Sequence, residues 1–179
     1  MKPGIIQDLL KNYTALVGRV DRHVKQVAQD YSHAIACQKG CDSCCRLLNL
    51  FPVEAFALSL AFSCLDKSCQ EIAMAALERQ NKECPLLVQG ECLLYPARPI
   101  ICRTHGFPLV FKKKAQTLVD FCPKNFKHMT SFPKESLLDL DQLNTLLSAI
   151  NQHFLKSIET QLPSRIPMSQ ALVLFRDME

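Results

Sequence analysis

The chain has 179 residues, no tryptophan, only three tyrosines and no long hydrophobic segment. Its longest mostly apolar stretch, residues 55–62, is far too short to span a membrane. Asp8 and Lys11 interrupt the apolar N-terminus before a signal-peptide core forms, so we expect a cytoplasmic protein without membrane association. A formal net charge of +4 is too small to indicate a nucleic-acid partner. No phosphate-binding loop or dinucleotide-binding fingerprint is present.

Cysteine, by contrast, is abundant, with ten residues in the chain. A chain of this length fits a single domain, residues 1–179, that can bury a core without disulfides or metal. In a reducing cytoplasm, many cysteines indicate metal or redox chemistry rather than disulfides. The role of these cysteines is therefore the main question about the function of the protein.

Two apolar stripes predict helices at the ends of the chain. The first covers residues 5–35, within an N-terminal segment 1–36, and packs either inside the chain or along a partner or second copy in a coiled coil. The second predicts a helix over 137–160, capped by Asp139 or Asp141, followed by a short helix at 169–174 within a C-terminal segment 137–179. The stripe residues are Ile6, Leu10, Tyr13, Val17, Val20, Val24, Val27 and Tyr31, and then Leu143, Leu147, Ile150, Phe154 and Ile158.

Between these helices, residues 37–122 contain the cysteines. Residues 52–82 predict two helices broken near Asp66. Turn residues 89–91 and the lysines at 112–114 each lie between short apolar runs and predict two β-hairpins. We therefore predict a mainly α fold with small β-hairpins, in which a helical scaffold carries a cysteine-rich metal-binding centre.

Four thiols fall within nine residues, at Cys37, Cys41, Cys44 and Cys45. Gly40 and the polar residues after Cys41 favour a turn whose backbone amides face sulfur and stabilise thiolates. The adjacent pair does not easily chelate one zinc ion in a relaxed tetrahedron. It indicates either two metal positions or one ligand beside a spare cysteine.

A second set of cysteines is dispersed, and two of its members precede proline, which fixes the exit of the chain from a metal site. This set either forms its own four-sulfur site or completes the first one; its members are Cys84, Cys92, Cys102 and Cys122. Arg46, Arg98 and Arg103 are near these cysteines in sequence. They either offset the negative charge of a thiolate site or form ordinary surface contacts.

Three further residues are weaker candidates. Cys64 and Cys69 lie five residues apart in a helical stretch and do not share a face, so we interpret them as small buried hydrophobic residues. His105 follows Cys102 by three residues and is structural, a base for that cysteine, or a metal ligand.

The order of these elements resembles the zinc- or iron-chelating cysteine-cluster family (YkgJ-type, named for a CxxCxxCC pattern). The resemblance covers residues 37–122 and rests on the double cysteine followed by the Cys-Pro-Leu, Gly-Glu-Cys-Leu-Leu-Tyr and Arg-Pro-Ile-Ile-Cys-Arg elements. It implies eight metal ligands: Cys37, Cys41, Cys44, Cys45, Cys84, Cys92, Cys102 and Cys122. The first gap here has three residues rather than two, which leaves Cys37 the least certain ligand.

We therefore predict a metal-binding protein that holds an iron–sulfur cluster or zinc, since eight sulfurs form a soft ligand set. Some family members are described as iron–sulfur oxidoreductases, so a redox or electron-transfer role is one expectation. The alternative is a structural zinc protein that acts as an interaction or metal-handling module, with a protein partner or self-association through the first helix. The sequence leaves open whether the protein is an enzyme.

Overall fold

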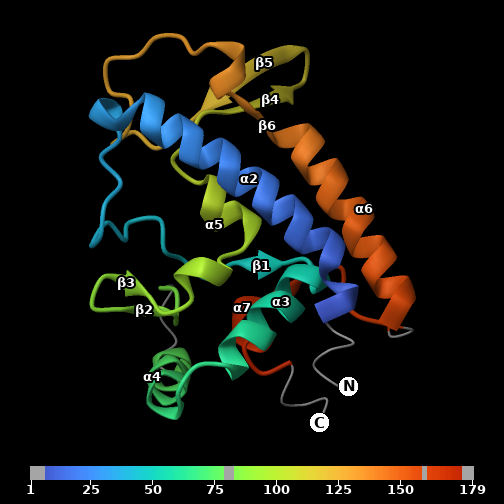
Figure 1. The fold of residues 1–179 in the computed structure, drawn as a ribbon. Coiled ribbons are helices and arrows are strands. Elements are labelled where there is room, and N and C mark those ends of the chain that lie inside the picture. The colour runs from blue at the N-terminus through green and yellow to red at the C-terminus, as the bar shows by residue number, and fades with distance from the viewer. Residues whose placement is uncertain (1–6, 79–82, 159–160, 175–179) are drawn as a thin grey trace.

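The structure, a computed structural model, describes residues 7–78, 83–158 and 161–174. Helices make up most of this part of the chain, and the short strands within it form three small sheets. Figure 1 shows two long helices, with one sheet at the top of the view and the other small elements below the first helix. A mainly α fold with small β-hairpins is therefore confirmed. No helix in these ranges has both the length and the apolar character needed to cross a membrane.

The two long helices, α2 (Lys11–Asp30) and α6 (Leu140–Ile158), lie side by side and run in opposite directions (Figure 1). Their apolar stripes meet in one core together with α3 (Pro52–Ser63). In this core the rings of Phe56 and Phe154 meet edge to face, with centroids 5.1 Å apart. The stripe of α2 is thus packed inside the chain. A protein partner or self-association through the first helix stays a prediction.

The boundaries of the terminal helices differ from the predicted ones. The helix predicted over 5–35 ends at Asp30, because Tyr31 leaves the helical conformation and the 3-10 helix η1 (Ser32–Ala34) turns the chain. Residues 5 and 6 lie outside the described residues, as do 159 and 160. The helix predicted from 137 begins at Leu140, since strand β6 (Leu138–Asp139) precedes it. Asp139 caps it by accepting a hydrogen bond from the Gln142 N–H at 2.9 Å.

Two shorter helices build a second core together with α3. The predicted break near Asp66 separates α3 from α4 (Lys67–Glu78), and residues 79–82 lie outside the described part. Helix α7 (Met168–Ala171) is shorter than the predicted 169–174 element. It follows strand β7 (Ile166–Pro167), which pairs antiparallel with β1 (Asn49–Leu50). The apolar side chains of these elements enclose Leu86, just before the first hairpin.

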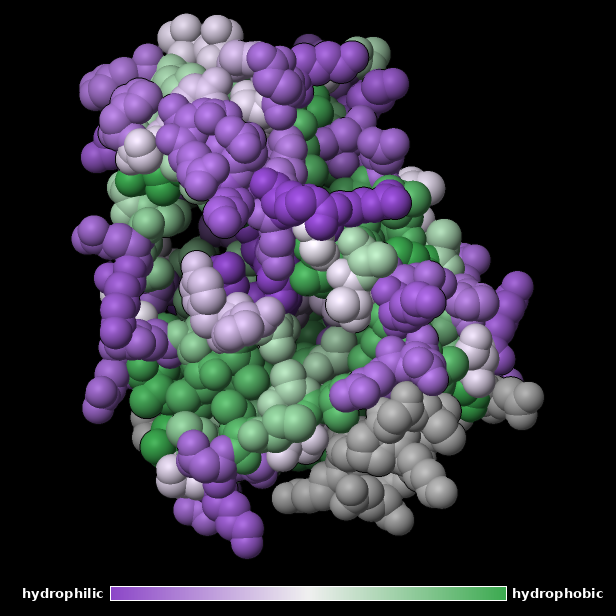
Figure 2. Space-filling view, in the orientation of Figure 1, coloured by the Kyte–Doolittle hydropathy of each residue, from purple (hydrophilic) through white to green (hydrophobic). Residues whose placement is uncertain are grey.

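Both predicted hairpins are present. Strands β2 (Leu87–Val88) and β3 (Glu91–Cys92) flank Gln89 and Gly90, whose φ angles of 50° and 78° give the tight turn that the sequence indicates. Strands β4 (Leu109–Lys113) and β5 (Gln116–Asp120) form the second hairpin, and β6 adds to β4 in parallel after the 3-10 helix η3 (Lys134–Ser136). Figure 2 shows a hydrophobic area over the first hairpin.

Helix α5 (Ile100–Thr104) carries Cys102 and is anchored at its N-terminus by a buried acid. The Ile100 N–H donates to Oε1 of Glu54 at 3.0 Å, and the Phe51 N–H donates to its Oε2 at 3.3 Å. Burial raises the pKa of Glu54, and the two N–H donors oppose that rise. The carboxyl group of Glu54 therefore joins the starts of α3 and α5, and so places the helix that holds Cys102.

Candidate metal centre

The eight predicted ligands lie in the loops and short elements beside the two cores. All ten cysteines are free thiols. After η1 the chain descends as an extended loop toward the β2–β3 hairpin (Figure 1). Within residues 7–78, 83–158 and 161–174, no three or more His, Cys, Asp or Glu side chains lie close enough together to hold a metal ion. Individual thiols are nevertheless close neighbours.

Four of these cysteines form a mutually close set, here called the inner group: Cys45, Cys84, Cys92 and Cys102. Burial and the neighbouring thiols Cys84 and Cys92 raise the pKa of the Cys102 thiol to about 12. Burial, together with the Cys92 and Cys45 thiols, raises the pKa of Cys84 to about 11. Burial and Cys92 also raise the pKa of Cys45. Every pair within the inner group therefore interacts electrostatically.

Backbone contacts hold the inner group together. The Cys84 N–H donates to the Cys45 carbonyl at 3.3 Å, beside an antiparallel bridge between Arg46 and Glu83. The N–H groups of Leu86 and Leu87 donate to the Cys84 thiol and lower its pKa, against the larger effect of burial. The Leu94 N–H does the same for Cys92. N–H donors two or three residues after a cysteine favour the thiolate, which is the form that binds metal.

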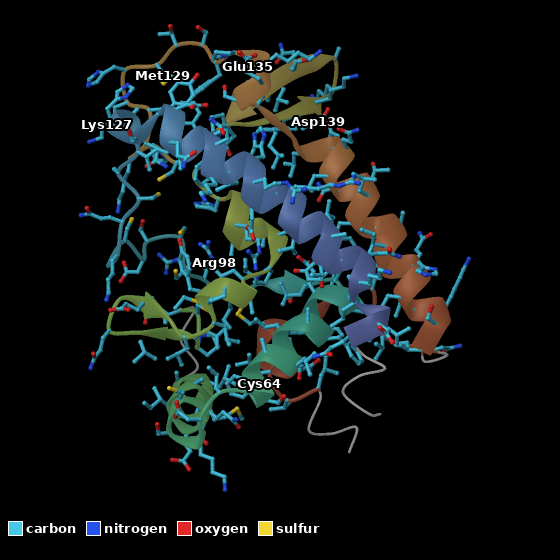
Figure 3. The ribbon with its side chains drawn as sticks, in the orientation of Figure 1. Cys64, Arg98, Lys127, Met129, Glu135 and Asp139 are labelled. Atoms are coloured by element: carbon cyan, nitrogen blue, oxygen red, sulfur yellow. The ribbon has the colours of Figure 1, made fainter. Side chains whose placement is uncertain are left out.

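Arg98 is a cation whose charge acts on two of the inner thiols. Its guanidinium lies 3.5 Å from the centre of the Tyr95 ring, at the start of the 3-10 helix η2 (Tyr95–Ala97), and its Nε donates to the Tyr95 carbonyl at 3.0 Å. Its charge opposes the effect of burial and lowers the pKa of Cys92 and Cys102. Figure 3 shows Arg98 between α5 and the first hairpin.

Arg103 has a different role, although the sequence placed it beside the same cysteines. Its side chain is only 7% exposed, and Nη1 donates to both carboxylate oxygens of Asp21 in α2, at 2.7 and 2.8 Å. Its Nε donates to the Arg98 carbonyl at 2.6 Å, and Nη2 donates to the Pro96 carbonyl. Arg103 therefore uses its donors to fasten the 96–98 loop to α2, rather than to offset thiolate charge. That Arg46 offsets thiolate charge stays a prediction.

The other four cysteines form the outer group: Cys37, Cys41, Cys44 and Cys122. Burial and the thiols of Cys41, Cys122 and Cys44 raise the pKa of Cys37. Burial, Cys45 and Cys41 raise the pKa of Cys44. Cys37 and Cys44 are exposed, whereas every member of the inner group is partly buried. The outer group is thus the more accessible of the two.

Two adjacent polar residues, which the sequence analysis did not single out, contact the outer group. The Nζ of Lys124 lies 3.1 Å from Ser43 Oγ and 3.9 Å from Cys41 Sγ. Asn125 is fully buried, and its Nδ2 donates to Cys37 Sγ at 3.3 Å. These two residues follow Cys122 and Pro123, so the same turn supplies a cysteine, a cation and an amide. The Cys-Pro junction is the only sequence signal for this turn.

The two groups meet at the adjacent residues Cys44 and Cys45, and each of these thiols affects the pKa of the other. A second connection runs through the tips of two loops. Lys39 and Glu91 form an ion pair at 2.7 Å, and a Cβ atom on Gly90 would lie 3.3 Å from the Gly40 Cα. The 37–45 loop therefore packs directly against the β2–β3 hairpin.

The chemistry of the donors fits a soft metal. Each group has four thiols, which is the ligand number of a structural zinc site or a cysteine-bound iron–sulfur cluster. Each group also has a nearby cation to offset the charge of about −2 that four thiolates leave on either centre. The sulfurs of each group are neighbours, but they do not lie close enough together to hold a metal ion. Metal uptake would therefore have to bring them closer, as in sites whose formation is coupled to local folding.

The weaker candidates lie elsewhere. Cys64 is exposed and Cys69 is partly exposed, so their interpretation as buried hydrophobic residues is wrong: they flank the exposed turn between α3 and α4. Figure 3 shows Cys64 far from Arg98. The Cys69 thiol donates to the Asp66 carboxylate, which raises its pKa. His105 is exposed just after α5, and its catalytic or ligand role stays a prediction.

No family model matches this chain, and no curated protein or solved structure is significantly similar to it. The resemblance of residues 37–122 to the zinc- or iron-chelating cysteine-cluster family therefore stays a prediction.

Proposed function

We propose that this chain binds metal through its eight cysteines as two four-thiolate centres, in the form of iron–sulfur clusters or zinc ions. The observation that carries the proposal is that the inner thiols are neighbours although they come from the 37–45 loop, the segment of the first hairpin and α5. Cysteines that serve only as small core residues have no need of N–H donors and a cation around their sulfurs. The resemblance to the YkgJ-type family supports the same conclusion.

The residues of each centre have distinct tasks. The eight thiols bind, the N–H groups after Cys84 and Cys92 favour their ionised form, and Arg98 and Lys124 offset the negative charge. Iron–sulfur clusters in such centres would supply one-electron transfer. The proposal includes a reducing compartment such as the cytoplasm, because ten cysteines stay free thiols only where disulfides do not form.

A structural zinc protein is the second candidate. The cysteines lie in irregular segments and short elements, and the backbone links between these segments are few, as in the single N–H contact from Cys84 to Cys45. Metal ligation would stabilise such segments directly. In that case the metal would join residues 37–122 to the helical cores, and a partner would bind elsewhere on the surface.

Elemental analysis with a visible spectrum, on protein purified without oxygen, tests the proposal. Iron and sulfide in equal amounts indicate iron–sulfur clusters, and zinc without iron indicates the structural alternative. We expect Cys102→Ser and Cys44→Ser each to lower bound metal by about half, while Cys64→Ser leaves it unchanged as the matched control. Wild-type protein without metal contradicts metal binding, and equal loss in all three variants contradicts the ligand assignment.

A further inference from the structure

Asn125 lies where three distant segments of the chain meet. Its Oδ1 accepts a hydrogen bond from the Ala36 N–H at 2.9 Å, and its Nδ2 donates to the Gly106 carbonyl at 2.8 Å. The same Nδ2 donates to the Cys37 sulfur at 3.3 Å. Beside it, the Phe126 N–H donates to the Ala34 carbonyl at 2.7 Å. The 122–126 turn is therefore fixed to the backbone just before Cys37.

The space around this amide is tightly filled. Asn125 is 0% exposed. Gly106 has a φ of +93°, and a Cβ atom there would lie 3.1 Å from Asn125 Nδ2, 3.4 Å from Cys37 Sγ and 3.5 Å from Cys122 Cβ. The glycine thus admits the amide and both cysteines into one place. Cys37 and Cys122, which are 85 positions apart, are brought together there.

The hydrogen bonds of Asn125 define its orientation. One amide hydrogen points to the Gly106 carbonyl, the other points to the sulfur, and the amide oxygen receives the Ala36 N–H. The reversed orientation would place the amide oxygen against the Gly106 carbonyl oxygen, so it is excluded. The N–H donor therefore faces the sulfur of Cys37, the cysteine whose role the sequence leaves least certain.

We infer that Asn125 is a positioning residue for the outer centre: it holds Cys37 beside Cys122 and directs an N–H donor to the Cys37 sulfur. This inference rests on the proposed function, because it assigns a role toward a metal that the outer thiols bind. Mutation of a group that orients and hydrogen-bonds a metal ligand typically weakens metal affinity about 10- to 100-fold. Asn125 thereby places Cys37 in the outer ligand set.

Cadmium binding measured by ¹¹³Cd NMR and by titration tests the inference, because the resonance position reports how many sulfurs hold the ion. We expect two sites per wild-type chain. Asn125→Asp keeps the shape and the acceptor oxygen but loses both N–H donors, so it weakens the outer site about 10- to 100-fold and leaves the inner resonance in place. A conformational check by circular dichroism accompanies each variant.

Asn151→Ala is the matched control, since Asn151 is also buried and also accepts a backbone N–H, from Val53 at 3.0 Å, but lies in α6. It should keep both cadmium sites. Equal loss in the two variants, or wild-type affinity in Asn125→Asp, overturns the inference. Absence of cadmium from the wild type instead contradicts the proposed function. If Asn125→Asp fails to fold, the side-chain amide resonances of Asn125 in the wild-type protein test the inference instead. They must shift when cadmium binds, and unchanged resonances overturn the inference.

Discussion

The inner and outer cysteine groups are arranged by different means. The inner sulfurs receive N–H donors from their own neighbours in sequence, as Leu86 and Leu87 do for Cys84. The outer sulfurs are contacted by side chains from a distant segment: Asn125 contacts Cys37 across 88 positions, and Lys124 contacts Cys41 across 83. Local backbone N–H groups thus surround the sulfurs of the inner group, whereas side chains from a distant segment contact the sulfurs of the outer group.

The two groups also differ in exposure. Burial raises the pKa of Cys84 and Cys102 in the inner group to about 11 and 12, whereas Cys37 and Cys44 in the outer group are exposed. A buried, mutually close set suits a retained centre, and an exposed set suits one that exchanges metal or meets a partner. If both groups bind metal as we propose, loading and loss of metal should be easier at the outer group.

Among the variants that distinguish the inner from the outer cysteine group, Arg103→Met should have the largest effect on stability. The variant leaves the Pro96 and Arg98 carbonyls without their donor and removes the pair with Asp21, so we expect a loss of about 3 kcal/mol in unfolding free energy. The released 96–98 loop should weaken the inner centre more than the outer one. Denaturant unfolding and ¹¹³Cd NMR measure the two effects.

The control for this variant is Arg22→Met, because Arg22 is exposed on the same helix that supplies Asp21. We expect it to change stability by less than about 0.5 kcal/mol. If Arg103→Met instead removes the outer cadmium resonance and spares the inner one, the assignment of the 96–98 loop to the inner group is wrong.

The sequence predicted those parts of the molecule that have a periodic or a local signal. Spaced apolar residues predicted both long helices, and Gln89 with Gly90 predicted the first hairpin, because only a few residues suit its positive φ angles. Asp139 is one of the two predicted caps, and it accepts the N-cap hydrogen bond. Each of these features depends on neighbours within a few positions, so one sequence suffices to find them.

Other features depend on contacts between distant residues and have no such signal. The choice of Asp21 rather than a thiol as the partner of Arg103 follows from the way α2 crosses α5, which no spacing of residues expresses. Asn125 is a single polar residue without periodicity, and only the folded chain brings it to Cys37. For the same reason, eight cysteines can be predicted as metal ligands from the sequence, but whether they form one site or two cannot.

A second, intermediate effect should appear in the order of thiol modification in metal-free protein. Thiolate is the reactive form, and a pKa of about 12 leaves Cys102 almost entirely protonated near neutral pH. We expect iodoacetamide at pH 8 to modify Cys102 and Cys84 at least about tenfold more slowly than exposed Cys44. Peptide mapping by mass spectrometry measures each rate.

The direction of the pH dependence follows from the same shifts. Because the folded pKa of Cys84 and Cys102 is raised above the unfolded value of 9.0, the thiols stabilise the metal-free fold below pH 9 and this contribution is lost as pH rises toward 11 and 12. Modification of the inner thiols should therefore accelerate steeply in that range. Equal rates for both groups at pH 8 would remove the distinction between buried and exposed sets.

The smallest effect should come from the ion pair between Lys39 and Glu91, which joins the tips of the two loops. Both side chains are well exposed, at 77% and 55%, so solvent screens the pair and Lys39→Met should cost less than about 1 kcal/mol. The packing of Gly40 against Gly90 remains in the variant and keeps the loops together. A double-mutant cycle with Glu91→Gln isolates the pair, and added salt should reduce the coupling. A coupling energy well above 1 kcal/mol, or loss of metal from both centres, would show that the two groups act as one site across this contact.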